Sequence, residues 1–287
     1  MVVIADYILV FIALLWIAAA CITDIKKREV ANWLSFSLIA IALAIRAFAA
    51  ILIQKPSFFL YGLAGLAVFF ALGNVLYHTR IFAGGDAKLL IALGAVFATT
   101  PSFVNLTSMR MPFLLLFFLN ILLFGSAYGI FYSIFLAIKN KKSFITEVKK
   151  LNIETKKLRF FFLAFVSLLL VMLLMTKLYN ILFLLAIVLI FPYLYIFVKA
   201  VENSCMIKLV SPKQLTEGDW LAKPVKIGKR TIKPKTEGLT VQDIAIIKKA
   251  RKKVLVKQGM PFVPVFLIAA IASLFGNIFA SIVSLLL

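Results

Sequence analysis

The stretch YILVFIALLWIAAACITDIKKREVANWLSFSLIAIALAIRAFAAILI, residues 7–53, decides the fold, because it holds two long apolar runs joined by a short charged segment. Each run is long enough to cross about 30 Å of hydrocarbon as a helix. The joining segment carries Lys26, Lys27 and Arg28, which are typical of a loop on the cytoplasmic side of a membrane. The stretch therefore predicts two membrane helices with a basic turn between them.

The rest of the chain continues this pattern. Of its 287 residues, 63% are hydrophobic, and the mean hydropathy is +1.06, whereas soluble domains are roughly 45–50% apolar. We therefore expect an all-α polytopic membrane protein with eight spans, or six spans plus a shallow hairpin. The predicted spans are Tyr7–Ile22, Trp33–Ile53, Phe58–Tyr77, Ala87–Phe103, Phe113–Ile138 and Phe262–Leu287, with a hairpin of Phe160–Met175 and Leu178–Val198.

The distribution of Lys and Arg over the loops predicts the orientation of the protein in the membrane. If the N-terminus lies outside the cell, the loops at 23–32, 78–88, 139–159 and 199–261 face the cytoplasm and hold 28 of the 32 Lys and Arg residues. The net charge of +21 is then explained by topology and by anionic lipid headgroups. We expect a multi-pass plasma-membrane protein that binds lipid and no nucleic acid.

The domain organisation follows from these spans. We predict catalytic transmembrane helices over 1–138, a basic cytoplasmic loop over 139–159, a transmembrane hairpin over 160–201, a small cytoplasmic α+β domain over 202–259, and a last transmembrane helix over 260–287. Within the small domain we predict strands at Met206–Val210 and Val225–Ile232, and a helix over Val241–Lys253. Thr240 and Asp243 are spaced as a capping box at the start of that helix. The basic run Lys248–Lys257 predicts a solvated helix face, or a surface that binds the membrane.

Two acids stand out in the membrane-rich half of the chain. Asp24 lies where the first predicted helix leaves the membrane, and Asp86 lies where the fourth begins. The predicted topology puts both on the cytoplasmic side, and acids at such positions are candidates for function. Two carboxyl groups that share a proton can activate a water and protonate a leaving amine. His78 is the one histidine, so we expect neither a histidine-rich metal site nor a cofactor.

The residues around Asp86 fit this interpretation. Gly84 and Gly85 remove side chains beside the acid, which permits a bend or the close approach of another segment. Lys88 is expected to anchor the helix at the interface.

The segments TDIKKREVANW and AGGDAKLLIALGA resemble the two aspartate motifs of type IV prepilin peptidases, above all of the archaeal prepilin and preflagellin (prearchaellin) peptidases. That family consists of membrane aspartic proteases with a GxGD motif. The resemblance carries over onto Asp24 and Asp86, with Asn32 and Gly85 also matching. Ala83 and Ala31 depart from it, since they stand where the first Gly of GxGD and the Pro before Asn belong. The stretch KQGMPFVPVFLIAAIASLFGN resembles the start of the last helix in the archaeal enzymes.

The resemblance implies an aspartic endopeptidase with Asp24 and Asp86 as catalytic residues. Its substrates would be prepilin-like or prearchaellin subunits with short basic leaders, cut at the cytoplasmic membrane face. Glu29 and Phe262 are possible substrate contacts. The cysteine pairs of many bacterial members, associated with methyltransferase activity, are absent, so we expect proteolysis without N-methylation.

Three alternatives remain at this point. A presenilin-like or signal-peptide-peptidase-like protease shares the chemistry, but has a Pro-Ala-Leu motif that this chain lacks. An ion-coupled transporter could use the paired acids for proton or cation binding, although such a protein should carry acids near the bilayer midplane. A scaffold for filament assembly without catalytic activity is the third.

Overall fold

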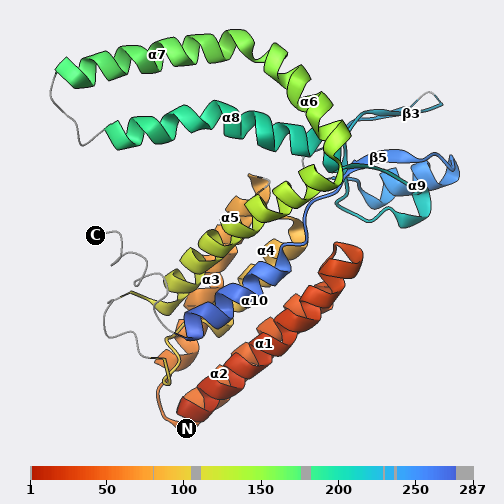
Figure 1. Cartoon of the computed structure of the whole chain (residues 1–287). Helices are drawn as coiled ribbons and strands as arrows, with labels where there is room; N and C mark the ends of the chain where they lie inside the picture. Colours follow the sequence, from red (N-terminus) through yellow and green to blue (C-terminus); the bar gives the residue numbers. More distant parts are fainter. Residues whose placement is uncertain are drawn as a thin grey trace. The chain divides into compact units, whose positions relative to one another are not determined.

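The structure is a computed structural model, and it describes residues 2–79, 81–104, 111–175, 182–228, 230–235 and 238–275. The described chain is mostly helical with a small sheet region (Figure 1). It divides into two compact units, one of Met1–Ile130 with Gly259–Leu287 and one of Phe131–Gln258. The expectation of a helical membrane protein with a small α+β part is confirmed at this level.

The first unit is a bundle of apolar helices. They are α1 (Val2–Lys27), α2 (Asn32–Leu52), α3 (Ser57–His78), α4 (Gly84–Val96), the first part of α5 (Phe113–Lys139), and α10 (Val263–Leu274). Helix α4 is central, because almost all of its side chains after Gly85 are buried. Gly65 and Gly94 let α3 and α4 cross closely, since a Cβ on Gly65 would lie 2.3 Å from the Gly94 carbonyl oxygen.

Five of the described helices are long and apolar enough to cross a membrane. They are Val2–Lys27, Asn32–Leu52, Ser57–His78, Phe113–Lys139 and Val188–Cys205. Several spans are thus present, but the predicted number of eight is not confirmed. Of the predicted last span Phe262–Leu287, the described part forms α10, and residues 276–287 lie outside the described residues.

The fourth predicted span is shorter than expected. The prediction was Ala87–Phe103, whereas α4 ends at Val96 after 13 residues, which at 1.5 Å per residue is about 20 Å. Pro101 stops the helix from continuing to Phe103, because the residue before a proline is pushed out of the helical conformation, and α4 ends four residues before Thr100. The sequence remains apolar after Val96, so hydropathy alone overestimated the length of the helix.

Arg46 donates hydrogen bonds to the last carbonyl groups of this short helix. Its side chain is fully buried and donates from Nε to the Ala95 carbonyl at 2.8 Å and from Nη2 to the Val96 carbonyl at 2.9 Å. Further bonds go to the Phe58 carbonyl at 3.1 Å and to Thr99 Oγ1 at 3.1 Å. The last carbonyls of a helix have no partner within the helix, so the guanidinium caps α4 inside the bundle.

The second unit begins with three helices, after the last part of α5. These are α6 (Lys141–Glu154), α7 (Lys156–Met175) and α8 (Leu182–Cys205). Residues 141–154, predicted as part of a loop, are therefore helical. The predicted hairpin corresponds to α7 and α8. Residues 176–181, which include the predicted turn 176–177 and the first residues of the second predicted helix, lie outside the described residues.

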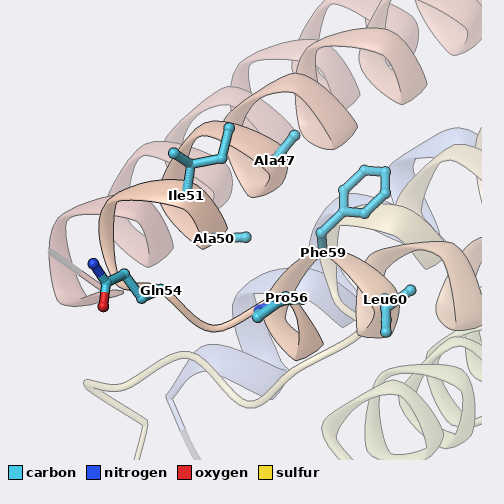
Figure 2. Close-up of a pocket in the computed structure, with 7 residues that line it drawn as sticks. All are labelled: Ala47, Ala50, Ile51, Gln54, Pro56, Phe59 and Leu60. Carbon is cyan, nitrogen blue, oxygen red and sulfur yellow. The ribbon is translucent and has the colours of Figure 1, made fainter.

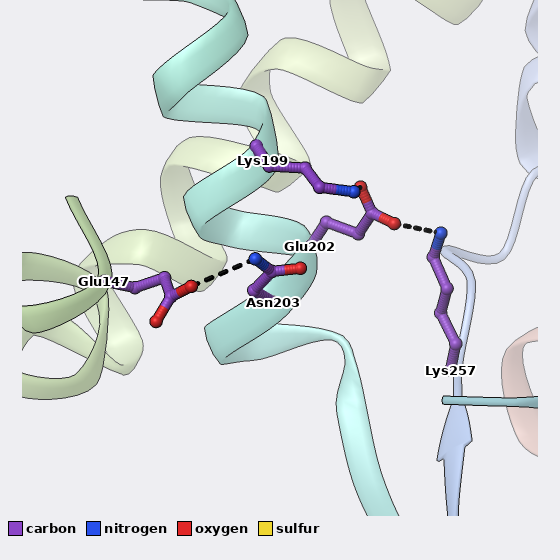
Figure 3. A network of polar contacts seen from close by, with 5 residues as sticks. All are labelled: Glu147, Lys199, Glu202, Asn203 and Lys257. Atoms are coloured by element: carbon purple, nitrogen blue, oxygen red, sulfur yellow. Dashed lines mark hydrogen bonds and ion pairs between the residues drawn. The ribbon is translucent and has the colours of Figure 1, made fainter. Parts of the chain in front are cut away.

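A polar network holds α8 in this unit (Figure 3). Glu202 pairs with Lys199 at 3.1 Å and with Lys257 of β5. Asn203 donates to Glu147 of α6 at 3.0 Å. The base of the hairpin is thus fixed both to α6 and to the small sheet.

The small domain has more strands than predicted. A sheet of order β1-β5-β2 and a hairpin β3-β4 are both antiparallel. The elements are β1 (Ile207–Val210), a 3-10 turn η2 (Pro212–Gln214), β2 (Trp220–Leu221), β3 (Val225–Ile227), β4 (Arg230–Ile232), α9 (Val241–Lys249) and β5 (Val254–Lys257). The predicted strand Val225–Ile232 is a hairpin because Gly228 turns the chain with φ of 56°.

The predicted helix Val241–Lys253 is also shorter than expected. It ends at Lys249, Arg251 takes a left-handed φ of 48°, and β5 follows. In β5, Val254 and Val256 are buried in alternation with less buried neighbours, the pattern of a strand with one face in the core. The basic run Lys248–Lys257 therefore covers a helix end and a strand, and the prediction of one helix face was wrong.

The start of α9 is as predicted. Thr240 Oγ1 accepts from the Asp243 N–H at 3.2 Å, and Asp243 Oδ2 accepts from the Thr240 N–H at 3.2 Å. These two bonds confirm the capping box. Lys235 adds an ion pair to Asp243 at 2.7 Å, and although desolvation opposes it, this pair and the capping bonds lower the pKa of Asp243.

We expect Thr240→Ala to destabilise α9 by about 1 kcal/mol, because it removes the cap. Hydrogen exchange of the full-length protein should show amides of Val241–Lys249 exchanging about fivefold faster. Thr231→Ala, at an exposed position in β4, is the matched control and should leave those amides unchanged. Equal exchange in the two variants would contradict the capping role.

Candidate active site

Asp24 lies in the last turn of α1, where its side chain is only 5% exposed. Its Oδ2 accepts a hydrogen bond from the backbone N–H of Val263 at 3.0 Å. Val263 is the first residue of α10, so this N–H has no acceptor within its own helix. The helix N-terminus also carries partial positive charge, which favours a carboxylate there. Asp24 is therefore held by a helix 239 residues further along the chain.

Arg28 closes the end of α1 beside Asp24. It takes a left-handed φ of 59°, and its N–H donates to the Asp24 carbonyl at 2.8 Å. Its Nη1 donates to the Gly259 carbonyl at 2.9 Å. Arg28 thus fastens the end of α1 to the segment that leads into α10.

Asp86 lies in the first turn of α4 and is 9% exposed. It lies three residues after the N-cap residue Ala83 and interacts electrostatically with Asp24. The structure therefore brings the two acids, 62 positions apart in sequence, into one electrostatic environment at the ends of α1 and α4.

Gly85 makes this approach possible. A Cβ added to Gly85 would lie 3.1 Å from Val30 Cβ and 3.2 Å from Val30 N. Val30 is buried in the segment that follows Asp24. A Cβ on Gly84 would meet nothing closer than 3.5 Å, on Tyr77. Of the two glycines, only Gly85 is at a position where a side chain would be crowded.

Gly85→Ala should lower the rate of substrate cleavage about tenfold, since a displacement of a few tenths of an ångström at a reacting group is costly. Gly84→Ala is the matched control, and we expect it to cleave at the unaltered rate. Both variants would be compared per folded protein after size-exclusion chromatography. If Gly84→Ala lost as much activity as Gly85→Ala, close packing on Val30 would not be the reason.

The two departures from the motif pattern fit their backbone positions. Ala83 has φ of −70° and ψ of 160°, an extended conformation that any residue adopts. Ala31 has φ of −64° and ψ of 130°, close to the φ that a proline ring imposes. Alanine therefore fits the backbone at each position without strain.

The remaining predicted site residues lie around this pair. Lys88 Nζ donates to Asn32 Oδ1 at 2.8 Å, which joins the start of α2 to α4. Glu29 is exposed. The Phe262 ring packs against Phe82 with centroids 5.0 Å apart and against Phe266 at 5.7 Å.

Sequence reasoning missed four features of the site. These are the Val263 N–H, the buried Val30 beside Gly85, the Phe82 ring, and the hydrogen bond from the Arg28 side chain to the Gly259 carbonyl. Phe82 stands directly before the AGGD motif, which was an available signal. A backbone N–H has no sequence signature beyond the helix start that Pro264 marks.

Within the part of the chain that the structure describes, no three His, Cys, Asp or Glu residues gather in a way that could hold a metal ion. The expectation of a site without metal or cofactor stays a prediction.

A pocket lies elsewhere in the first unit. Figure 2 shows it where α2 ends and α3 begins. Its volume is about 510 Å³. It is lined by Ala47, Ala50, Ile51, Gln54, Pro56, Phe59 and Leu60. None of these side chains ionises, so its chemistry is that of a hydrocarbon contact and differs from that of the acid pair.

Fold and site together define a multi-pass helical membrane protein with two buried carboxyl groups at helix ends. Residues 11–137 match the family model Peptidase_A24, the type IV leader peptidase family. This segment contains both acids, and the match supports the resemblance stated from the sequence.

The chain is also similar to prepilin peptidase EppA of Methanothermobacter thermautotrophicus. The two are 36% identical over 96 residues, which is 33% of this chain and 25% of that relative. The match thus spans about a quarter of the relative's length. No solved structure matches the chain.

Proposed function

We propose that the protein is a membrane aspartic endopeptidase that removes short basic leader peptides from prepilin-like or prearchaellin subunits. Asp24 and Asp86 are the proposed catalytic residues. The observation that carries the proposal is that the family segment brings these two buried acids, from separate motifs, into one electrostatic environment. The name of the similar relative, a prepilin peptidase, supports the substrate class.

The proposed mechanism divides the work between the two carboxyl groups. One carboxyl group is ionised and accepts a proton from a water molecule while the oxygen of that water attacks the scissile carbonyl carbon. The other, protonated, donates its proton to the amide nitrogen as the C–N bond breaks. The products are a new carboxyl group on the leader and a new amine on the subunit. Hydrogen bonds such as that from Val263 to Asp24 hold the groups before the substrate arrives.

The second part of the proposal concerns the location and orientation of the protein in the membrane. We infer a plasma-membrane protein with the N-terminus outside and eight spans, because this orientation places nearly all basic residues in the cytoplasm. Exposed apolar side chains on the spanning helices, such as Phe11, Phe48 and Phe70, would face lipid. The apolar helix of the substrate would lie in the bilayer while its basic leader stays in the cytoplasm.

Glu29 is the proposed contact for the basic leader. It is exposed, lies five residues after Asp24, and is the one acid in a turn of three basic residues. Exposed ion pairs contribute about 0–1 kcal/mol, so this contact would orient the leader more than it would bind it.

The experiment is cleavage of a panel of prepilin-like and prearchaellin precursors by the full-length protein in detergent or membranes. The cut site is read by mass spectrometry. We expect one cut at the junction of leader and apolar helix, with one precursor class preferred. Cleavage inside the apolar helix would favour a presenilin-like protease. If no precursor is cut, the transporter and scaffold alternatives are favoured.

A further inference from the structure

The segment that leads into α10, residues 259–263, touches both aspartate motifs. At one end the Gly259 carbonyl accepts from Arg28, and at the other the Val263 N–H donates to Asp24. We call residues 259–263 the lead-in segment. Two hydrogen bonds thus join it to the end of α1, on either side of its proline.

The lead-in segment reaches the second motif through aromatic rings. Phe262 lies 5.0 Å from Phe82 between centroids, and Phe266 lies 5.8 Å from Phe82. Phe82 is buried and stands four residues before Asp86. Ring pairs at such distances contribute beyond their buried area, so the position of Phe82 depends on that of Phe262.

A glycine on α5 also lies against the Phe262 ring. A Cβ on Gly125 would lie 2.8 Å from Phe262 Cζ and 3.2 Å from Cε2. The ring therefore occupies the space that a side chain at position 125 would take. One turn further along α5, a Cβ on Gly129 would lie 3.4 Å from Met260 Cε, an ordinary contact with a flexible side chain.

We propose that the lead-in segment positions the two acids relative to each other, with Phe262 as a positioning residue held between Gly125 and Phe82. The inference rests on the proposed function. It assigns Phe262 a different role from the substrate contact suggested by the sequence, because its ring acts on the Asp86 motif through Phe82 while the adjacent Val263 N–H holds Asp24.

The test uses Gly125→Ala in the full-length protein, with Gly129→Ala as the matched control on the same helix. The added methyl pushes the Phe262 ring, so we expect kcat for leader cleavage to fall about tenfold while KM stays within about twofold. Gly129→Ala should match the unaltered enzyme in both constants. Rates are taken per folded protein, from the monodisperse fraction.

A double variant tests whether contact with the Phe262 ring causes the loss of kcat. Gly125→Ala combined with Phe262→Leu shortens the side chain that the methyl strikes, and should raise kcat from the value of Gly125→Ala alone to about that of Phe262→Leu alone. If Gly125→Ala does not fold, Phe262→Leu alone tests the positioning role. We expect that variant to have a severalfold lower kcat and an unchanged KM.

Three results would overturn the inference. They are a Gly125→Ala enzyme equal to the Gly129→Ala enzyme, no recovery in the double variant, or a raised KM with unchanged kcat, which would restore Phe262 as a substrate contact. A failure of the proposed function is distinguishable, because the unaltered protein would then cleave no precursor at all.

Discussion

Asp24→Asn and Asp86→Asn should each lower the rate of leader cleavage by about 10²- to 10⁴-fold. Asparagine keeps the shape of the side chain and removes the proton exchange on which the proposed mechanism depends. Since both acids are buried, the exchange of a carboxyl for an amide group should leave packing nearly intact. The measurement is initial rate on the precursor that the unaltered enzyme cleaves best.

Asp219→Asn, in the small domain, is the control for the loss of an acid outside the site. All three variants are compared as monodisperse protein with similar thermal stability. A folded Asp24→Asn or Asp86→Asn enzyme with unaltered activity would remove that residue from the mechanism.

Arg46→Met should have the largest effect on stability. It deletes the donors to the Ala95, Val96 and Phe58 carbonyls inside the bundle, and each unsatisfied buried group costs about 1–3 kcal/mol. A total of about 3–5 kcal/mol corresponds to a fall of roughly 10 °C in the apparent Tm. Thermal unfolding of the full-length protein in detergent measures it.

Lys55→Met is the control, because Lys55 is exposed near the same end of α2. We expect its Tm to change little. Arg46→Lys should fall between the two, since an ammonium cannot reach all the carbonyls that the guanidinium spans. An Arg46→Met protein as stable as the unaltered one would mean that α4 does not need this cap.

Local signals explain what the sequence could predict. Long apolar runs indicated α1, α2, α3 and α5 because each helix is apolar over a stretch long enough to cross a membrane. The scarcity of acids singled out Asp24 and Asp86, which the structure brings into one electrostatic environment. The Thr240–Asp243 spacing indicated the start of α9 because a capping box depends on adjacent residues alone.

What the sequence could not predict depends on tertiary contacts. The end of α4 at Val96 involves Arg46, 50 positions away in the chain. Strand β5 is stabilised by its pairing with β1 and β2, and the basic run around it gave no indication of that pairing. The hydrogen bond to Asp24 is donated by a backbone N–H, a group that every residue except proline has.

The most direct test of the paired-acid mechanism is the binding of a non-cleavable leader peptide. Its scissile amide is replaced by a hydroxyl-bearing tetrahedral group, which resembles the intermediate formed when water adds. The account predicts that the unaltered enzyme binds this peptide at least about 100-fold more tightly than the matched substrate, and that Asp24→Asn and Asp86→Asn each lose this preference. Equal affinity for the two peptides in the unaltered enzyme would contradict catalysis by the acid pair.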